Sequence, residues 1–115
     1  ASVFRMGGAT ISTPAYSEGR IYTAGGDGRV YAVDFRSGRE IWHFQTEHQV
    51  TGSPIVFEDS VYCGSVDGSM YCLDMRSGRK RWTYRTGGPI TGTPTISEGS
   101  IYFGSTDHHV YALLT

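Results

Sequence analysis

The sequence lacks any long apolar run, and none of its stretches approaches the roughly 18 to 20 residues that a membrane-spanning helix needs. It also lacks a charge excess, because 10 lysines and arginines stand against 11 aspartates and glutamates, for a formal net charge of -1. No global field therefore indicates nucleic acid, a membrane surface or an acidic partner. The opening ASVFRMGG lacks the basic start and the apolar stretch of a signal peptide. These absences predict a soluble chain, or a soluble piece of a longer one.

Glycine and tyrosine, in contrast, are abundant, with 16 and 8 residues, and apolar residues rarely recur at helical spacing. This composition favours short β-strands joined by tight turns, with almost no helix. The length of 115 residues suits one domain with a core of its own.

The chain repeats itself every 40 residues without an insertion or deletion. The aligned sets are Pro14, Pro54 and Pro94; Tyr22, Tyr62 and Tyr102; Asp27, Asp67 and Asp107; Tyr31, Tyr71 and Tyr111; and Trp42 with Trp82. A fixed period near 40 with four short strand candidates per copy predicts the blades of a β-propeller. We expect a single all-β domain over residues 1–115, built from three four-stranded antiparallel repeats at 1–40, 41–80 and 81–115.

The strand candidates of one copy are RWTYRT, TPTIS, SIYFGS and HVYALL. Between the last two lies a hairpin turn, which carries Asp-Gly at 27–28 and 67–68. His108 holds the glycine position in the third copy, and histidine tolerates left-handed backbone better than most residues. The central strands carry apolar side chains on both faces, so they need cover on both sides, which neighbouring blades would supply.

Three blades are fewer than the usual four to eight of a closed ring. A free three-blade arc would expose large apolar faces. We therefore expect a partial or half propeller, which is either one half of a six-bladed ring made by two chains or part of a longer propeller. A strand at residues 2–6 could complete the last blade, in this molecule or in another.

The hairpin turns carry three aspartates, Asp27, Asp67 and Asp107. They either form a ring of metal-binding carboxylates or are ordinary turn residues that accept hydrogen bonds from their own backbone. We favour the second interpretation because aspartate belongs to the hairpin pattern itself. The histidines show no spacing typical of a metal site, so we expect no metal and no catalytic residue.

Two cysteines lie in adjacent strand candidates of the second copy. A two- or four-residue hairpin loop would place Cys63 directly opposite Cys72, and the two-residue loop would bring them within reach of a disulfide. A three-residue loop would set Cys63 opposite Tyr71 instead. In the alternative interpretation the two are small buried thiols.

Charges of both signs alternate at one end of the predicted blades, which indicates a self-neutralising rim rather than a nucleic-acid surface. The other end carries the loops with less charge, and loops on a rigid scaffold often carry recognition. We predict that a peptide or small ligand binds there, at His48, Gln49, His108 and His109.

The stretch from Ala32 to Trp42 resembles the tryptophan-docking motif of quinoprotein-type propellers, A-x-D-x-x-T-G-x-x-x-W, with Ser37 in place of threonine. Residues 72–82 repeat the motif with cysteine in place of alanine. The resemblance to propellers of PQQ-like (pyrroloquinoline quinone) repeats covers essentially the whole chain. It implies that the tryptophan lies flat between neighbouring blades and donates its indole hydrogen bond to the next one. The structural docking residues so implied are Trp42, Trp82, Asp34, Asp74, Gly38 and Gly78.

Quinoprotein dehydrogenases of this kind are implied to need a longer chain, a calcium ion held by acidic and amide side chains, and two adjacent cysteines. This sequence has no Cys-Cys dipeptide and no asparagine. We therefore expect no enzyme activity and no cofactor. The first hypothesis is a non-catalytic scaffold or protein-binding module, as similar repeats are in outer-membrane assembly lipoproteins.

Three alternatives stay open: a fragment of a PQQ-dependent dehydrogenase, a sensor region of a bacterial membrane kinase, or a chain selected or engineered as a propeller building block. The resemblance implies a periplasmic or extracellular location, and partners that are either proteins or a second copy of the chain.

Overall fold

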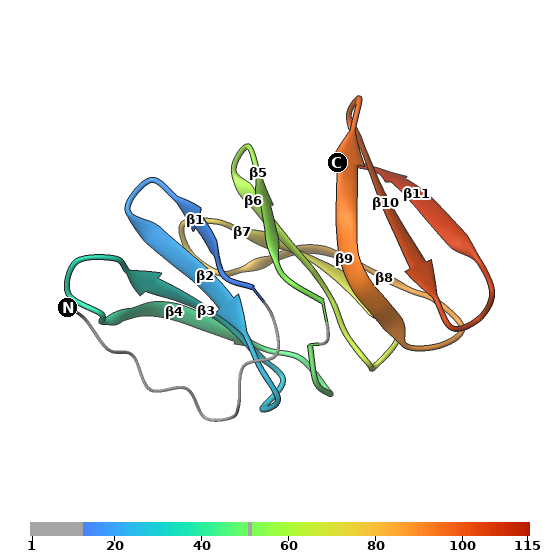
Figure 1. Cartoon of the computed structure of the whole chain (residues 1–115), viewed down its shortest axis with the longest axis horizontal. Coiled ribbons are helices and arrows are strands. Elements are labelled where there is room, and N and C mark those ends of the chain that lie inside the picture. Colours follow the sequence, from blue (N-terminus) through green and yellow to red (C-terminus); the bar gives the residue numbers. More distant parts are fainter. Residues whose placement is uncertain (1–12, 51) are drawn as a thin grey trace.

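The computed structural model describes residues 13–50 and 52–115, and in those ranges the chain forms eleven strands and no helix (Figure 1). The first sheet has the order β1 (Ala15–Ser17), β2 (Arg20–Ala24), β3 (Arg29–Asp34) and β4 (Glu40–Gln45). The second has the order β5 (Ile55–Phe57), β6 (Ser60–Gly64), β7 (Ser69–Asp74) and β8 (Lys80–Arg85). The third contains β9 (Ile90–Ser97), β10 (Ser100–Ser105) and β11 (Val110–Leu114). No helix long and apolar enough to cross a membrane occurs among the described residues.

The three sheets stand side by side like successive blades, and consecutive strands pair antiparallel in each of them (Figure 1). The prediction of an all-β partial propeller is therefore confirmed. The third sheet has three strands in the described part of the chain. The strand expected at residues 2–6 lies outside the described residues.

The hairpin between β6 and β7 has a three-residue loop. The Ser65 amide donates to the Ser69 carbonyl oxygen at 3.1 Å, and the Gly68 amide donates back to the Ser65 carbonyl oxygen at 3.1 Å. Gly68 has a φ of 91°, which is the left-handed position that such loops place before the second strand. His108 occupies the same place in the third sheet with a φ of 74°, so the expectation for this residue is confirmed.

With this three-residue loop the two cysteines do not lie directly opposite each other. The register pairs Cys63 with Tyr71 and Cys72 with Tyr62. One residue of shift turns the two side chains to opposite faces of the sheet, since successive residues of a strand alternate. Cys63 belongs to the core between the first and second sheets, and Cys72 to the core between the second and third. Both are free, buried thiols, so of the two interpretations left open by the sequence the structure agrees with the small buried thiols and not with the possible disulfide.

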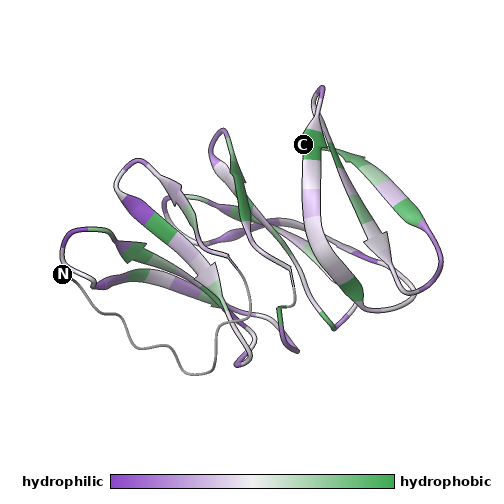
Figure 2. Cartoon of the chain, viewed as in Figure 1, coloured by the Kyte–Doolittle hydropathy of each residue, from purple (hydrophilic) through white to green (hydrophobic). Residues whose placement is uncertain are grey.

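Two apolar cores lie between the sheets. The first packs the β2, β3 and β4 side chains Tyr22, Val30 and Trp42 against Val61 and Leu73 of the second sheet. The second core packs Met70 and Cys72 of the second sheet against Ile101 and Phe103 of the third. Figure 2 shows hydrophobic residues along these strands and hydrophilic ones at many of the turns. The second sheet is thus covered on both faces, as its sequence pattern predicts.

Candidate functional site

Trp42 lies on β4 and spans the junction between the first two sheets. Its side chain is 7% exposed, and its Nε1 donates to the Met75 carbonyl oxygen at 3.0 Å. The ring rests on Gly78 of the turn between β7 and β8, where an added Cβ would lie 2.5 Å from the Trp42 Cδ2. A large ring with one polar group suits this place, because it fills the space between two twisted sheets and satisfies its own N–H.

Trp82 occupies the equivalent position on β8 but is only half-buried. Its ring centroid lies 6.0 Å from that of Tyr62, just as Trp42 lies 6.0 Å from Tyr22. The pairing with the tyrosine of its own sheet is therefore kept, while the carbonyl contact of Trp42 has no counterpart for Trp82 among the described residues. For both tryptophans a role in holding blades together stays a prediction.

Asp34 and Asp74 organise the turns from β3 to β4 and from β7 to β8. Each Oδ1 accepts two backbone hydrogen bonds: Asp34 from Arg36 and Ser37 at 2.9 Å each, and Asp74 from Arg76 at 2.8 Å and Ser77 at 3.3 Å. These amide donors lower the pKa of both carboxyl groups, because they stabilise the charged form. The predicted backbone hydrogen bonds of the two aspartates are thus present.

The aspartates of the β2–β3, β6–β7 and β10–β11 turns are held by hydrogen bonds in every copy. Asp67 accepts the Ser69 amide at 2.8 Å and the Tyr71 hydroxyl at 2.5 Å, and Asp107 accepts the His109 amide at 3.0 Å and the Tyr111 hydroxyl at 2.5 Å. Asp27 repeats the pattern with Arg29 and Tyr31. This is the turn-capping arrangement. No group of three or more side chains suited to a metal ion occurs in residues 13–50 and 52–115.

Two of these aspartates also reach the preceding sheet. The Glu47 amide donates to Asp67 Oδ2 at 3.3 Å, and the Gly87 amide donates to Asp107 Oδ2 at 2.9 Å. The Tyr111 hydroxyl is the main cause of the lowered pKa of Asp107, and that carboxylate in turn raises the pKa of Tyr111 to about 12. At neutral pH the Asp107 carboxylate is therefore charged and the Tyr111 hydroxyl keeps its proton, which it donates to the carboxylate.

The predicted binding residues His48, Gln49, His108 and His109 are all exposed. The loop after β4 and the β10–β11 hairpin emerge at the same end of the blades, as predicted (Figure 1). The backbone of His48 and Gln49 packs on the β6–β7 hairpin, where Ser65 Oγ donates to the Gln49 carbonyl oxygen at 3.1 Å. His109 Nδ1 instead lies 3.3 Å from Asp107 Oδ1 in the third sheet. The two loops thus pack on different sheets, and a binding face formed by the four residues stays a prediction.

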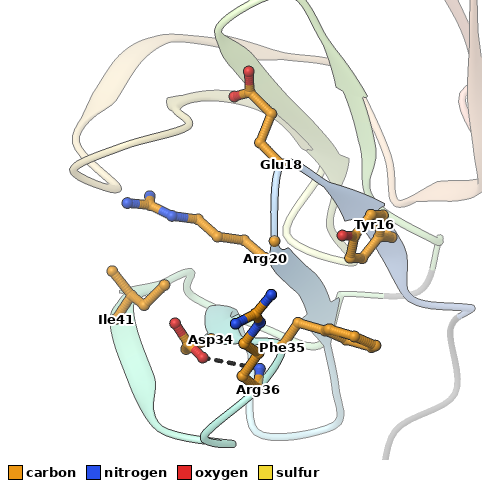
Figure 3. Close-up of a pocket in the computed structure, with 8 residues that line it drawn as sticks. Tyr16, Glu18, Arg20, Asp34, Phe35, Arg36 and Ile41 are labelled. Atoms are coloured by element: carbon orange, nitrogen blue, oxygen red, sulfur yellow. Dashed lines mark hydrogen bonds between the residues drawn. The ribbon is translucent and has the colours of Figure 1, made fainter.

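A pocket of about 570 Å³ opens at the other end of the first sheet, between the β1–β2 and β3–β4 turns (Figure 3). Its lining residues are Tyr16, Glu18, Gly19, Arg20, Asp34, Phe35, Arg36 and Ile41, and we call it the rim pocket. Tyr16 and Phe35 are 59% and 57% exposed, with their rings edge to face at a centroid distance of 5.3 Å and an angle of 77°. A backbone hydrogen bond of 2.9 Å from the Phe35 amide to the Gly19 carbonyl oxygen joins the two turns.

Arg20 fixes the wall of the rim pocket. Its Nη1 donates to the carbonyl oxygens of Met75 at 3.2 Å and Arg76 at 3.3 Å, so its guanidinium bridges to the second sheet. Because these carbonyl acceptors are neutral, they do not cancel the positive charge of the Arg20 guanidinium, which stays at the edge of the pocket. The pocket thus combines an exposed aromatic pair, an aliphatic side chain at Ile41 and charges of both signs.

Sequence reasoning missed the rim pocket because it assigned this end of the blades to charged residues only. The signal lies in a comparison of copies 40 residues apart: Phe35 stands where the second copy has the buried Met75, and Ile41 stands where it has Arg81. In the second sheet Arg81 Nη2 contacts Asp74 Oδ2 at 3.3 Å. In the first sheet Ile41 stands in the place of that arginine and lines the pocket together with Phe35.

The two thiols make a testable contrast with reactive cysteines. Burial raises the pKa of Cys63 to about 12 and also raises the pKa of Cys72, so almost no thiolate exists at neutral pH. We expect that neither thiol reacts with Ellman's reagent at pH 8 in the native protein and that both react in guanidinium chloride. One equivalent released from the native protein, or a mass lower by two hydrogens before reduction, would contradict this assignment.

Comparison with known proteins gives a match over nearly the whole chain. A family model described as outer membrane protein assembly factor BamB matches residues 4–115. BamB of Nitrosomonas eutropha is 40% identical over 42 residues, which make up 36% of this chain and 10% of that protein.

Solved structures show the same fold. The crystal structure of BamB from Moraxella catarrhalis has a TM-score of 0.86 at 23% identity and covers 94% of this chain and 34% of that one. The quinohemoprotein alcohol dehydrogenase ADHIIG from Pseudomonas putida HK5 has a TM-score of 0.86 at 25% identity, with 99% and 20% covered. That from Comamonas testosteroni has a TM-score of 0.75 at 24% identity, with 91% and 18% covered. The chain therefore spans a third or less of the length of the Nitrosomonas, Pseudomonas and Comamonas proteins, and 34% of the Moraxella one.

Proposed function

Since the chain belongs to the family of the outer membrane protein assembly factor BamB, a family of PQQ-like repeat propellers, we propose that it is a non-catalytic module that binds a protein partner. By the names of its relatives, that partner takes part in outer membrane protein assembly. The same resemblance supports a periplasmic or extracellular location.

The observation that carries this proposal is the exposed aromatic pair of the rim pocket. Tyr16 and Phe35 are large side chains that stay more than half exposed on a rigid sheet end. Aromatic and arginine side chains dominate the binding energy of protein interfaces, and here Arg20 and Arg36 flank the pair. Ile41 extends the apolar surface, so one apolar side chain of a partner would have a ready anchor.

A second candidate, part of a quinoprotein dehydrogenase, has the likeness to the Pseudomonas enzyme in its favour. The residues present do not fit the cofactor and its calcium ion. The carboxylates of Asp27, Asp67 and Asp107 are each taken up by a backbone amide and a tyrosine hydroxyl. The sequence has no asparagine and no pair of adjacent cysteines that could meet the quinone. We therefore derive no reaction for this chain.

Photocrosslinking tests the proposal and separates the two ends of the blades. A photoreactive phenylalanine analogue replaces Phe35 in one variant and His108 in another, and both chains are produced in the periplasm of a Gram-negative bacterium. We expect irradiation to join the Phe35 variant to one protein of the outer membrane assembly machinery, with little product from the His108 variant. Tyr16→Ser should reduce the crosslink several-fold, because it removes half of the aromatic pair.

Each outcome has a distinct meaning. A crosslink from position 108 alone would place binding at the predicted histidine loops and refute the rim pocket. The absence of a product from both positions would refute protein binding at either end. Addition of PQQ and calcium gives the complementary control, and a cofactor absorption band would support the dehydrogenase instead.

A further inference from the structure

We propose that the turn between β7 and β8 binds an acidic segment of a protein partner through Arg76, Arg79 and Lys80, which we call the basic turn. This inference rests on the proposed protein-binding function and names the chemistry of a second contact, on the second sheet. The contact is electrostatic, whereas the rim pocket offers an apolar anchor.

The first argument is the difference between two copies of the same turn. After the turn between β3 and β4 the chain continues with Glu40 and Ile41, whereas the same two places forty positions later hold Lys80 and Arg81. Lys80 is also the only lysine of the sequence. Both places are variable positions of the docking motif, so the fold itself does not require a basic residue at either of them.

The second argument is that the turn is held in one shape. Asp74 Oδ1 accepts the Arg76 amide at 2.8 Å, and the Asp74 amide donates to the Arg79 carbonyl oxygen at 2.7 Å. Gly78, in the middle of the turn, packs beneath the ring of Trp42. A ligand that binds the basic turn therefore pays little entropy for ordering its backbone.

The third argument is the lack of acidic partners for these cations. Arg76, Arg79 and Lys80 are exposed, and none of them forms an ion pair within residues 13–50 and 52–115. Arg81 does, since its Nη2 lies 3.3 Å from Asp74 Oδ2. The sequence predicts a self-neutralising rim at this end of the blades, but at the basic turn three cations have no close counter-charge.

A further cation reaches the same turn from the first sheet. Arg20 Nη1 donates to the carbonyl oxygens of Met75 at 3.2 Å and Arg76 at 3.3 Å, and Figure 3 shows its side chain extending away from the Phe35 ring. Cations that gather in this way repel one another, and an anion bound among them relieves the repulsion. The turn therefore favours an anionic ligand.

The neighbouring turn between β5 and β6 indicates which kind of anion fits. The Met75 amide donates to the Asp59 carbonyl oxygen at 2.9 Å, so the exposed residues Glu58 and Asp59 lie beside the basic turn. A flat anionic membrane would meet these carboxylates together with the cations, whereas a narrow segment can contact the cations alone. Arginine also binds carboxylates through two parallel hydrogen bonds. Both observations favour an acidic protein segment over a membrane surface.

A hexaglutamate peptide with blocked ends and a fluorescent label is the probe, and fluorescence anisotropy measures its binding to the full chain. At about 20 mM sodium chloride we expect saturable binding, at least about tenfold tighter than that of hexaglutamine, which has no charge. Binding should weaken at least about fivefold at about 200 mM sodium chloride, because salt screens exposed charges.

Two charge reversals on one strand locate the site. Lys80→Glu gives the second sheet the residue that the first sheet carries as Glu40, in the same register, so the fold accommodates it. It should weaken hexaglutamate at least about fivefold. Arg85→Glu is the matched control, because it changes the net charge equally at the other end of β8 and removes only an exposed ion pair with Glu47. It should leave binding within about twofold.

A carbodiimide gives an independent readout of the contact. It joins a carboxylate to a nearby amine as an amide and takes up the released water as a urea. Because Lys80 is the only lysine, peptide mass spectrometry should find the hexaglutamate attached there. Lys80→Arg keeps the positive charge, so it should abolish this product and leave binding within about twofold. Attachment at the N-terminal amine alone would contradict the proposed site.

The outcomes separate this proposal from the one before it. Similar binding of hexaglutamate and hexaglutamine, or an equal loss with Lys80→Glu and Arg85→Glu, would overturn the acidic-segment site. So would binding to phosphatidylglycerol vesicles without binding to hexaglutamate. A partner crosslinked at position 35 would in those cases still support protein binding by the rim pocket. Failure of that crosslink, with hexaglutamate binding intact, would refute the rim pocket alone.

Discussion

Replacing Trp42 with alanine is expected to lower the free energy of unfolding by about 3 to 5 kcal/mol, which is the usual cost of removing a buried tryptophan. The ring is 7% exposed and packs in the core between the first and second sheets. The Met75 carbonyl oxygen keeps donors in Tyr22 at 3.3 Å and Arg20 at 3.2 Å after the change. The loss should therefore come mainly from the cavity rather than from an unsatisfied acceptor. Urea denaturation measures it.

Two further variants separate the contributions of ring volume, hydrogen bond and burial to this loss of stability. Trp42→Phe keeps most of the ring volume and loses the indole N–H, so it should cost clearly less than alanine, with about 1 kcal/mol from the hydrogen bond itself. Trp82→Ala removes a half-buried ring that lacks the carbonyl contact, and we expect a smaller loss than at position 42. An equal loss at both positions, or less than about 1 kcal/mol at position 42, would refute the docking role.

The second large effect is expected at Gly78, the residue on which the Trp42 ring rests. Gly78 has a φ of 76°, which costs a residue with a side chain about 1 to 2 kcal/mol. An added Cβ would also lie 2.5 Å from Trp42 Cδ2 and 2.6 Å from Cε3, and overpacking of this kind costs about 1 to 3 kcal/mol more. Gly78→Ala should therefore destabilise the protein by about 2 to 5 kcal/mol in the same urea measurement.

Gly99 provides the matched control. It has a φ of 79° in the turn between β9 and β10, and an added Cβ would meet no atom within 4 Å. Gly99→Ala should show the backbone cost alone. If the two glycine variants lost the same stability, the close contact between Gly78 and the Trp42 ring would contribute nothing, and the docking geometry would be wrong.

The architecture could be read from the sequence because its signals are local and repeated. The 40-residue period, the Asp-Gly turns and the two-sided apolar strands each follow from backbone preference and burial, and all three describe the same sheets. The positive φ of His108 could likewise be anticipated, since its place in the repeat is the place of Gly68. Consistency between local preference and overall fold is typical of natural sequences.

The details that failed depend on single-residue geometry. The residue opposite Cys63 depends on whether the loop before Ser69 has two or three residues. Gly68 adopts left-handed backbone, which permits the three-residue loop. The burial of Trp82 depends on a neighbouring sheet rather than on its own strand. The rim pocket arises from Phe35 and Ile41, which are unremarkable within their copy and stand out only beside Met75 and Arg81.

The aspartates that reach back to the preceding sheet have a consequence for how the protein assembles. Asp67 and Asp107 each accept a hydrogen bond from an amide that lies twenty positions earlier in the chain. Each of these hydrogen bonds therefore joins two blades that follow one another in the chain. These hydrogen bonds can form as soon as the next hairpin has folded, because they need no contact with more distant parts of the chain. Contacts of this kind between neighbours suit a repeat protein, in which the stability of each blade depends mainly on the blades next to it in the chain.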